Sequence, residues 1–558
     1  MGSESKTWLK RIILLAGALL LLLALRIPGL SQPYHQDEFD WAMVALPNSP
    51  VAGVIPHPPI SEFVFTTAGR LFANDNLRMM PFMLSIANLF LLYVVVKRRY
   101  GVKPALVSAF LYALAFFSVL ASLMLDNDGQ TLPLLFLLSI YCYDKWRESV
   151  GKRARIVWLA CFATAMVLGF LTKMCFVIPA FAFVLDFLME KRLLANRKMW
   201  LKVGAGLAGA AVVLAVALWN AHYIFAHFDI RSSFHYWTRF MDIAHRGWLQ
   251  IVIQGLKGVM YLSPLLVAPL LLSSKEQRTK ARLFWIFGLA AFVFYFILFD
   301  FSAGALDRYM EVFIVPLVVI SSLVYAELLD AKMVGKKWLL TAALSGVVLF
   351  ALQFLPHYVP PHHPKSEWFW RIASFRWNFL FPFSGGSGPL GFYVSFLMIA
   401  VCFLACGVCI AVSWYRPRLR APLILVVAAL GLSYNLAFNE EYLTGRINGF
   451  TPVLLWDALA ALEARPEIKQ VISYNDIGSY YLTNMGRYYR RLYAVPEYDE
   501  SNIEKMNGFN GYYLVIDFPR INPDSIYAKF FSRCRPVYSD VSGLIKADVL
   551  DCRDVPIR

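Results

Sequence analysis

Charged residues are scarce in this chain of 558 residues. Asp, Glu, Lys and Arg together make up 16% of the sequence, whereas hydrophobic residues make up 59%. A soluble protein does not bury so much apolar surface, so the composition excludes the soluble globular classes. It predicts instead a polytopic α-helical membrane protein, in which lipid covers much of the apolar surface.

Metal-binding and cleaved-signal patterns are also absent from the sequence. The eight Cys are scattered, and none stands at metal-ligand spacing with His. Cys534 and Cys552 lie in a polar region and could pair there if that region faces an oxidising compartment. No small-residue cleavage site follows the N-terminal apolar run, because Arg26-Ile27-Pro28 intervenes. This run is therefore predicted to remain as the first membrane span.

Long apolar windows recur along the chain and predict about 13 transmembrane helices. The windows cover residues 11–30, 79–96, 104–125, 130–143, 156–171, 174–189, 200–220, 249–272, 283–300, 310–329, 338–356, 391–413 and 420–437. No internal repeat accompanies them. The absence of inverted-repeat hydropathy disfavours a secondary transporter.

Acidic residues are fewer than basic ones, and 53 Lys and Arg against 37 Asp and Glu give a net charge of +16. The basic residues gather in every second loop, which is the positive-inside pattern and argues against nucleic acid as a partner. The N-terminus and all basic loops are then cytoplasmic, and the loops 31–78, 221–248 and 357–390 lie on the opposite side. The compact loops are typical of a bacterial inner membrane.

The chain changes character after residue 437, where the predicted transmembrane domain (1–437) ends. Residues 438–558 are polar and contain short β-rich runs at 470–474 and 511–517, with a helical stretch near 452–464. This alternation predicts a small C-terminal α/β domain. The pattern of basic loops places that domain on the extracytoplasmic side.

Three carboxylates follow the first span directly. Asp37, Glu38 and Asp40 stand at the mouth of a membrane helix, where acidic residues are costly to place. A carboxylate there stays wet enough to remain ionised, as a general base must, and can still act on a cavity of low dielectric constant. Asp37 and Glu38 are therefore candidate catalytic residues, and Asp40 is interpreted as a surface residue. An ordinary polar loop is the alternative.

A second motif in the same loop consists of His57, Pro58 and Pro59. Two prolines restrict the backbone and hold the preceding His rigidly. A neutral imidazole can donate a hydrogen bond to phosphate, or bind a divalent ion together with Glu62. His57 and Glu62 are thus the candidates for a metal site, and a plain structural turn is the alternative.

Further charged residues lie in turns on the predicted outer side. Asp126 and Asp128 share one turn, Lys173 lies between two spans, and Arg308 with Tyr309 opens another. Two cations on the same face as a group of carboxylates favour a phosphate site. The alternatives are simple turn formation for the aspartates and anchoring to lipid headgroups for the cations.

In combination, these motifs resemble the GT-C membrane glycosyltransferases, in particular the protein O-mannosyltransferases and the aminoarabinose transferases that modify lipid A. The resemblance covers roughly 8–330 and includes the acidic pair, the Pro-Pro turn, Leu171-Thr172-Lys173 and Arg308-Tyr309. It departs from the mannosyltransferase pattern at Ser61-Glu62-Phe63, where a Lys is expected. It departs from the aminoarabinose transferase pattern at Pro56-His57, where Glu-Lys is expected.

The resemblance implies a glycosyltransferase that moves a sugar from a polyprenyl-phosphate donor to an extracytoplasmic lipid, glycan or protein. The resemblance implies that Asp37, with Glu38, is the base that activates the acceptor. It implies that Lys173 and Arg308, with Tyr309, bind the donor phosphate. Asp126 or Asp128 would then line the cavity. Direct displacement by the acceptor inverts the anomeric carbon and needs no enzyme nucleophile. No organic cofactor is implied, and a divalent metal ion is left open.

Two other classes of function compete with this interpretation. A transporter or flippase for a polyprenyl-linked or anionic lipid would need many spans, but also ionisable residues near span centres. A non-catalytic assembly subunit would use its outer domain to bind a partner. The charged residues gather at one face here, which favours chemistry at the membrane interface.

Overall fold

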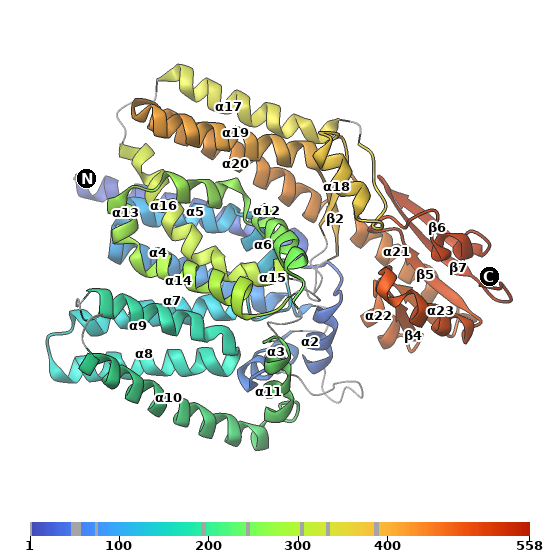
Figure 1. Ribbon diagram of the computed structural model, residues 1–558, viewed down its shortest axis with the longest axis horizontal. Helices are drawn as coiled ribbons and strands as arrows, with labels where there is room; N and C mark the ends of the chain where they lie inside the picture. The colour runs from blue at the N-terminus through green and yellow to red at the C-terminus, as the bar shows by residue number, and fades with distance from the viewer. Residues whose placement is uncertain are drawn as a thin grey trace. The chain divides into compact units, whose positions relative to one another are not determined.

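The computed structural model of the protein consists of two compact units (Figure 1). The helical unit comprises 1–30, 41–342 and 407–431, and the mixed unit comprises 31–40, 343–406 and 432–558. The residues that the structure describes are 3–45, 57–72, 76–190, 193, 197–241, 246–301, 306–330, 335–355, 357–383 and 390–557. Parts of the three predicted outer loops, at 46–56, 73–75, 242–245 and 384–389, lie outside the described residues.

Helices dominate the helical unit, as the apolar windows predict. They are α1 (Ser3–Arg26), α3 (Pro59–Leu71), α4 (Met79–Tyr100), α5 (Val102–Leu114), α6 (Phe116–Leu123), α7 (Thr131–Glu148), α8 (Lys152–Thr172), α9 (Val177–Glu190), α10 (Arg197–Ile224), α11 (Ile230–Arg239), α12 (Trp248–Leu272), α13 (Lys275–Lys280), α14 (Arg282–Val293), α15 (Leu306–Tyr309) and α16 (Ile314–Asp330). Four more helices have parts in both units, namely α2 (Asp37–Ala45), α17 (Lys336–Ala351), α19 (Phe396–Tyr415) and α20 (Arg420–Leu443).

Every predicted span overlaps a helix or a broken helix, and the window 391–413 begins in a short strand, Phe392–Ser395, before α19. Among the described residues, nine helices are long and apolar enough to cross a membrane, and the bent pair α5–α6 would make a tenth. The windows at 130–143, 174–189 and 283–300 fall on α7, α9 and α14. The total of about 13 spans stays a prediction.

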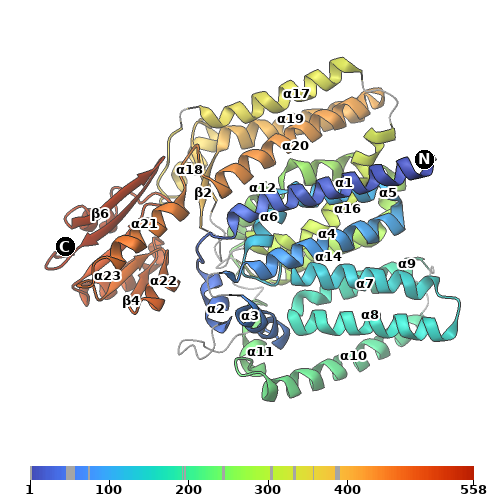
Figure 2. The ribbon, with the colours of Figure 1, turned by 180° about the vertical axis from the view of Figure 1, so that it is seen from behind.

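The helices α7 to α10 lie side by side in both views (Figures 1 and 2). The outermost, α10, exposes Leu201, Val212 and Trp219, which are 67%, 64% and 57% accessible. A helix that is apolar on its exposed face needs an apolar solvent, which only the bilayer provides.

Two buried arginines hold the ends of the short helix α6. Helices α5 and α6 meet at a bend of 62°. Arg26, fully buried at the end of α1, donates to the Ala113 carbonyl at 2.8 Å and to Ser118 Oγ at 3.1 Å. At the other end, Arg78 donates to the Leu123 carbonyl. Backbone carbonyls released by a helix break need such donors in an apolar interior.

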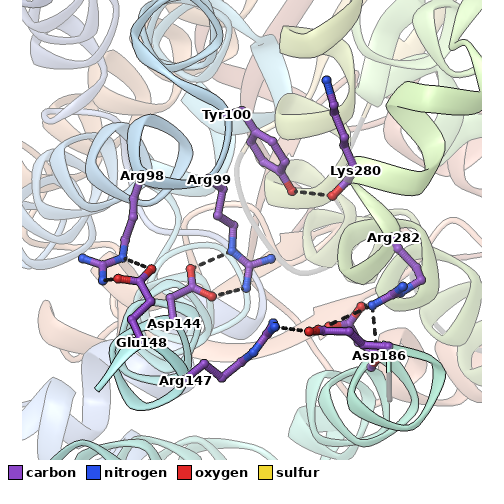
Figure 3. A network of polar contacts seen from close by, with 10 residues as sticks. Arg98, Arg99, Tyr100, Asp144, Arg147, Glu148, Asp186, Lys280 and Arg282 are labelled. Atoms are coloured by element: carbon purple, nitrogen blue, oxygen red, sulfur yellow. Dashed lines mark hydrogen bonds and ion pairs between the residues drawn. The ribbon is translucent and has the colours of Figure 1, made fainter. Parts of the chain in front are cut away.

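Ion pairs link helix ends near the C-terminal end of α7, one helix length away from the turn at 126–128 (Figure 3). Arg99 of α4 donates two hydrogen bonds of 2.7 and 2.6 Å to the Asp144 carboxylate of α7. Arg282 of α14 donates to Asp186 of α9 at 2.8 Å. These residues border four basic loops, so the structure gathers loops that the alternating pattern assigns to one side of the membrane.

The C-terminal part of the mixed unit is an α/β domain, as predicted. Its sheet has the order β4-β3-β5-β7-β6, with β4 and β5 parallel to β3, and β7 antiparallel to both β5 and β6. Its elements are α21 (Thr451–Glu463), β3 (Val471–Tyr474), α22 (Ser479–Asn484), β4 (Tyr488–Leu492), α23 (Asp499–Asn507), β5 (Tyr512–Ile516), α24 (Ile526–Phe531), β6 (Arg535–Ser542) and β7 (Ile545–Asp551). The mixed unit also contains α18 (Ser366–Ala373) and a hairpin of β1 (Leu380–Phe383) with β2 (Phe392–Ser395).

Strand alternation in β5 builds one apolar core on each face of this sheet. Leu514 and Ile516 pack in a cluster with Leu455 of α21. Tyr513 and Val515 point to the other face, in a cluster that includes α24. Cys534 and Cys552, which the sequence allowed to pair, form a disulfide.

We expect that Arg99→Ala lowers the free energy of unfolding by roughly 3–5 kcal/mol, because it leaves the buried Asp144 carboxylate without its partner. The two side chains are only 15% and 9% exposed. The matched control is Lys280→Ala, which breaks an exposed pair with Glu276 and should change stability little. Thermal unfolding in detergent measures both. Equal shifts in the two variants would contradict a stabilising role for the buried pair.

Candidate active site

The turn between α6 and α7 carries two buried carboxylates. Asp126 Oδ1 accepts hydrogen bonds from the backbone N–H groups of Asn127 (2.5 Å) and Asp128 (3.4 Å), which shapes the turn. The other oxygen of Asp126 lies 3.3 Å from Arg308 Nε. The turn therefore presents both aspartates to the interior, beyond the structural role that turn residues usually have.

Each buried cation of this cluster faces one of the aspartates. Lys173 directly follows α8, and its Nζ forms an ion pair with Asp128. Arg308 of α15 pairs with Asp126, and its Nη2 donates to the Tyr309 hydroxyl at 2.8 Å. Both cations also lie over the Tyr309 ring, at 4.8 Å for Lys173 and 4.7 Å for Arg308. Segments more than a hundred residues apart in sequence thus form one cluster.

Mutual attraction keeps Lys173 and Asp126 of this cluster charged. Burial by itself lowers the pKa of Lys173, but Asp128 and Asp126 outweigh burial and raise that pKa above its ordinary value. Burial likewise favours the neutral form of Asp126, but Lys173 and Arg308 hold its pKa below the ordinary value. A buried charge is tolerated only with such a partner.

Glu311 is a member of this cluster that the sequence analysis missed. It is fully buried, and neither of its side-chain oxygens has a hydrogen-bond partner among the described residues. Its Oε2 lies only 2.6 Å from where a Cβ at Gly129 would stand, so a glycine is required at the end of the turn. A Glu inside a predicted span was the available signal, since intramembrane carboxyls are rarely without a function.

The His57 motif contributes to the same cluster. Pro58 precedes α3, and Pro59 occupies the first helical position, where a missing N–H is not costly. The His57 ring stacks on Trp41 (5.5 Å between centroids). Burial, with the nearby charge of Lys173, lowers the pKa of His57 to about 3, so its ring is neutral.

Glu62 has a different environment from His57. Its carboxylate accepts a hydrogen bond from the backbone N–H of His227 at 3.2 Å. Ser61, next to it, donates to the Thr172 carbonyl at 2.8 Å and so anchors α3 beside Lys173. Within the part of the chain that the structure describes, no group of three or more His, Cys, Asp or Glu side chains is placed to hold a metal ion. The residues present therefore do not favour a metal site at His57 and Glu62.

The segment 221–248 brings a second unexpected residue to the cluster. Its helix α11 directs Tyr236 onto His57, with 5.6 Å between ring centroids and nearly perpendicular rings. Tyr236 also hydrogen-bonds with Tyr309, and burial raises its pKa above the ordinary value. A short amphipathic helix predicts an interfacial location, but periodicity alone does not single out one of its aromatic residues.

The acidic segment after α1 belongs to the mixed unit, and its structure separates Asp37 from Glu38. Both lie in the first turn of α2, where the helix dipole favours negative charge. Glu38 is fully buried and accepts a hydrogen bond from the His35 backbone N–H at 3.1 Å, which resembles half of a capping box. Asp37 is exposed. Partial burial, together with Asp37, raises the pKa of Asp40 to about 6.

This segment is held in place by aromatic residues of α22. The Tyr34 ring lies 5.1 Å from that of Tyr480, and the Tyr34 backbone N–H donates to the Tyr481 hydroxyl at 3.1 Å. Rigid neighbours of this kind limit the positions that the Asp37 carboxylate can take.

A comparison with protein families matches the segment of the chain that carries several of the site residues. Residues 56–219 match the model of the family described as dolichyl-phosphate-mannose-protein mannosyltransferase. This segment includes His57, Asp126, Asp128 and Lys173. A comparison with curated protein sequences finds no match.

The chain is an integral membrane protein with the fold of the GT-C membrane glycosyltransferases. The structure of ArnT from Cupriavidus metallidurans in the apo state is 17% identical to it, with a TM-score of 0.54 and 98% of each chain covered. The structure of the same protein bound to undecaprenyl phosphate is 16% identical, with a TM-score of 0.55 and the same coverage. The predicted fold class and the GT-C resemblance are confirmed.

We expect His57 to make stability depend on pH. Its pKa is about 3 in the folded protein, whereas that of a free imidazole side chain is 6.5, so the unfolded chain binds the proton first as pH falls. Stability is therefore lost below about pH 6.5, by roughly 2 kcal/mol on reaching about pH 5. Thermal midpoints of His57→Gln should fall less than those of the wild type over this range, whereas those of the exposed His235→Gln should follow the wild type. Identical pH dependence in all three proteins would contradict a buried neutral imidazole.

Proposed function

We propose that the protein is a glycosyltransferase that moves a sugar from a polyprenyl-phosphate donor to an extracytoplasmic lipid, glycan or protein. The observation that carries this proposal is the pair of buried cations, Lys173 and Arg308, that share the Tyr309 ring in a chain with the GT-C fold. Lys and Arg side chains bind phosphate oxygens through charge-assisted hydrogen bonds, and here one of each lies at the same tyrosine ring. One of the solved structures with the same fold holds undecaprenyl phosphate.

The donor phosphate binds between Lys173 and Arg308. An ammonium has three N–H donors and a guanidinium five, so each cation can donate hydrogen bonds to phosphate oxygens that replace its aspartate. Asp128 and Asp126 keep the two cations charged and oriented before the donor arrives. His57 is neutral and lies in the same cluster, where its imidazole can donate a hydrogen bond to phosphate.

Asp37 accepts the proton of the acceptor hydroxyl or amine. The acceptor then attacks the anomeric carbon, and the bond between that carbon and the phosphate oxygen breaks. The phosphate leaves with the bonding electrons, which the two cations stabilise, and the configuration at carbon inverts. Glu38 already accepts a backbone hydrogen bond, so it positions α2 while the exposed Asp37 meets the acceptor.

The proposed orientation has the N-terminus in the cytoplasm and the C-terminal domain outside, in a bacterial inner membrane. Transfer of a radiolabelled sugar from a polyprenyl-phosphate sugar to an added acceptor fraction tests the activity. A flippase would move the labelled lipid across a vesicle membrane without transfer. An assembly subunit would do neither.

We expect Asp37→Asn to reduce transfer by about 10²–10⁴-fold, because loss of a general base typically costs that much. Asp40→Asn is the matched control, since it removes a neighbouring carboxylate of the same helix turn. Turnover by the purified proteins measures the difference. Wild-type turnover in Asp37→Asn would exclude Asp37 as the base and make Glu38 the candidate.

We expect Arg308→Ala and Lys173→Ala each to weaken donor binding about tenfold or more. Charge-assisted hydrogen bonds contribute roughly 1.5–3 kcal/mol, and about 1.4 kcal/mol is a factor of ten. Acceptor affinity should change little. A titration with a short-chain polyprenyl-phosphate sugar measures the donor, with the exposed Arg153→Ala as control. Unchanged donor affinity in both site variants would contradict phosphate binding and favour the alternative, in which Lys173 and Arg308 anchor the protein to lipid headgroups.

A further inference from the structure

The α/β domain carries a second basic site, which the proposed transfer reaction does not use. A groove of about 510 Å³ on this domain is lined by Arg465, Glu467, Ile468, Tyr512, Arg535, Pro536, Val537 and Arg553. Three of these eight residues are arginines, and one is acidic. All of them lie within residues 465–553 of the mixed unit, so the groove belongs to a single compact unit.

Strand register places two of the groove residues, Tyr512 and Arg535, in one row across the sheet on either side of Asp551. Asp551 of β7 is paired with Tyr512 of β5 on one side and with Arg535 of β6 on the other. Directly paired residues of neighbouring strands present their side chains on the same face. Arg553 bends back over this row, where its guanidinium lies 5.0 Å from the Tyr512 ring.

The disulfide fixes the spacing of the two arginines at the strand ends. Arg535 directly follows Cys534, and Arg553 directly follows Cys552. Between the two arginines lies Asp551, which accepts hydrogen bonds of 2.9 and 2.8 Å from Arg553. Arg535 Nη2 lies 3.7 Å from the same carboxylate. These hydrogen bonds and charges hold the pKa of Asp551 below its ordinary value.

The third arginine that lines the groove is Arg465. The Arg465 guanidinium donates to the Ala461 carbonyl at 2.6 Å and to the Val537 carbonyl at 3.0 Å, which fixes it across the groove. Carbonyl acceptors satisfy its hydrogen bonds without cancelling its charge. The side chains of Arg535 and Arg553 remain 78% and 52% exposed, so a ligand in solution can reach them.

We propose that this groove binds the phosphate group of a phosphorylated saccharide or of a lipid headgroup. Three guanidinium groups face one groove against two carboxylates, Glu467 and Asp551. The planar guanidinium group presents its N–H donors in a geometry that matches the oxygens of phosphate. The single carboxylate of Asp551 cannot accept hydrogen bonds from all the donors of these arginines. The groove is independent of the Lys173 cluster, so it can bind phosphate whether or not the proposed transfer is correct.

Calorimetric titration of the full-length protein in neutral detergent with glucose 6-phosphate tests the groove, with glucose as the uncharged control ligand. Arg535→Gln and Arg553→Gln should each weaken binding about tenfold. Asp551→Asn should strengthen it, because the competing carboxylate is removed without a change of shape. Arg533→Gln is the matched control, since Arg533 is exposed and close in sequence but does not line the groove.

Binding that persists in Arg308→Gln but is weakened in Arg535→Gln supports the groove and separates it from the proposed donor site. No saturable binding in Arg308→Gln, or equal affinity in Arg535→Gln and Arg533→Gln, would overturn the proposal. The source of the phosphate follows from nanodiscs of phosphatidylcholine with and without phosphatidic acid. Competition by phosphatidic acid supports binding of a lipid headgroup, and unchanged binding of glucose 6-phosphate supports a soluble phosphorylated saccharide.

Discussion

The pairing of two buried cations with two buried aspartates is the constraint on which the candidate site depends. Lys173 and Arg308 lie where water is largely excluded, and each is tolerable only because a carboxylate faces it. The pairs tie the turn after α6 to the end of α8 and to α15. If any of these elements packed in a different position, a buried charge would lose its partner. The ion pairs therefore specify how these helix ends pack against one another.

The surrounding helices supply the rigidity that this cluster requires. Arg26 and Arg78 satisfy carbonyls at the two ends of α6, so the turn that follows α6 begins from a fixed point. Ser61 links α3 to the end of α8, which places His57 near Lys173. In each case a polar side chain satisfies a carbonyl that would otherwise be left unpaired in an apolar medium, and the same hydrogen bond sets the position of a functional residue.

Sequence patterns predicted the helices and the charged members of the cluster because both follow from the cost of polar groups in lipid. Lys173, Arg308, Asp126 and Asp128 were recognisable because they interrupt apolar segments. Tyr236 was not recognisable as a member, because only the fold determines which residue of an aromatic helix points inward. The arginine groove was hidden for a similar reason. It depends on the pairing of β7 with β5 and β6, and strand register cannot be read from single strands.

The two ends of the helical unit use the same residue types for different purposes, and the balance of charge distinguishes them. At the end that holds Arg99, each buried charge has a partner of opposite sign and close geometry, which serves stability. Around Lys173, three carboxyl groups including Glu311 accompany two cations. A phosphate cannot simply be added to such a cluster, because each cation is already paired with an aspartate and the phosphate would bring negative charge without a partner. Donor binding must therefore be an exchange, in which phosphate oxygens replace a carboxylate at a cation or a proton is taken up with the donor.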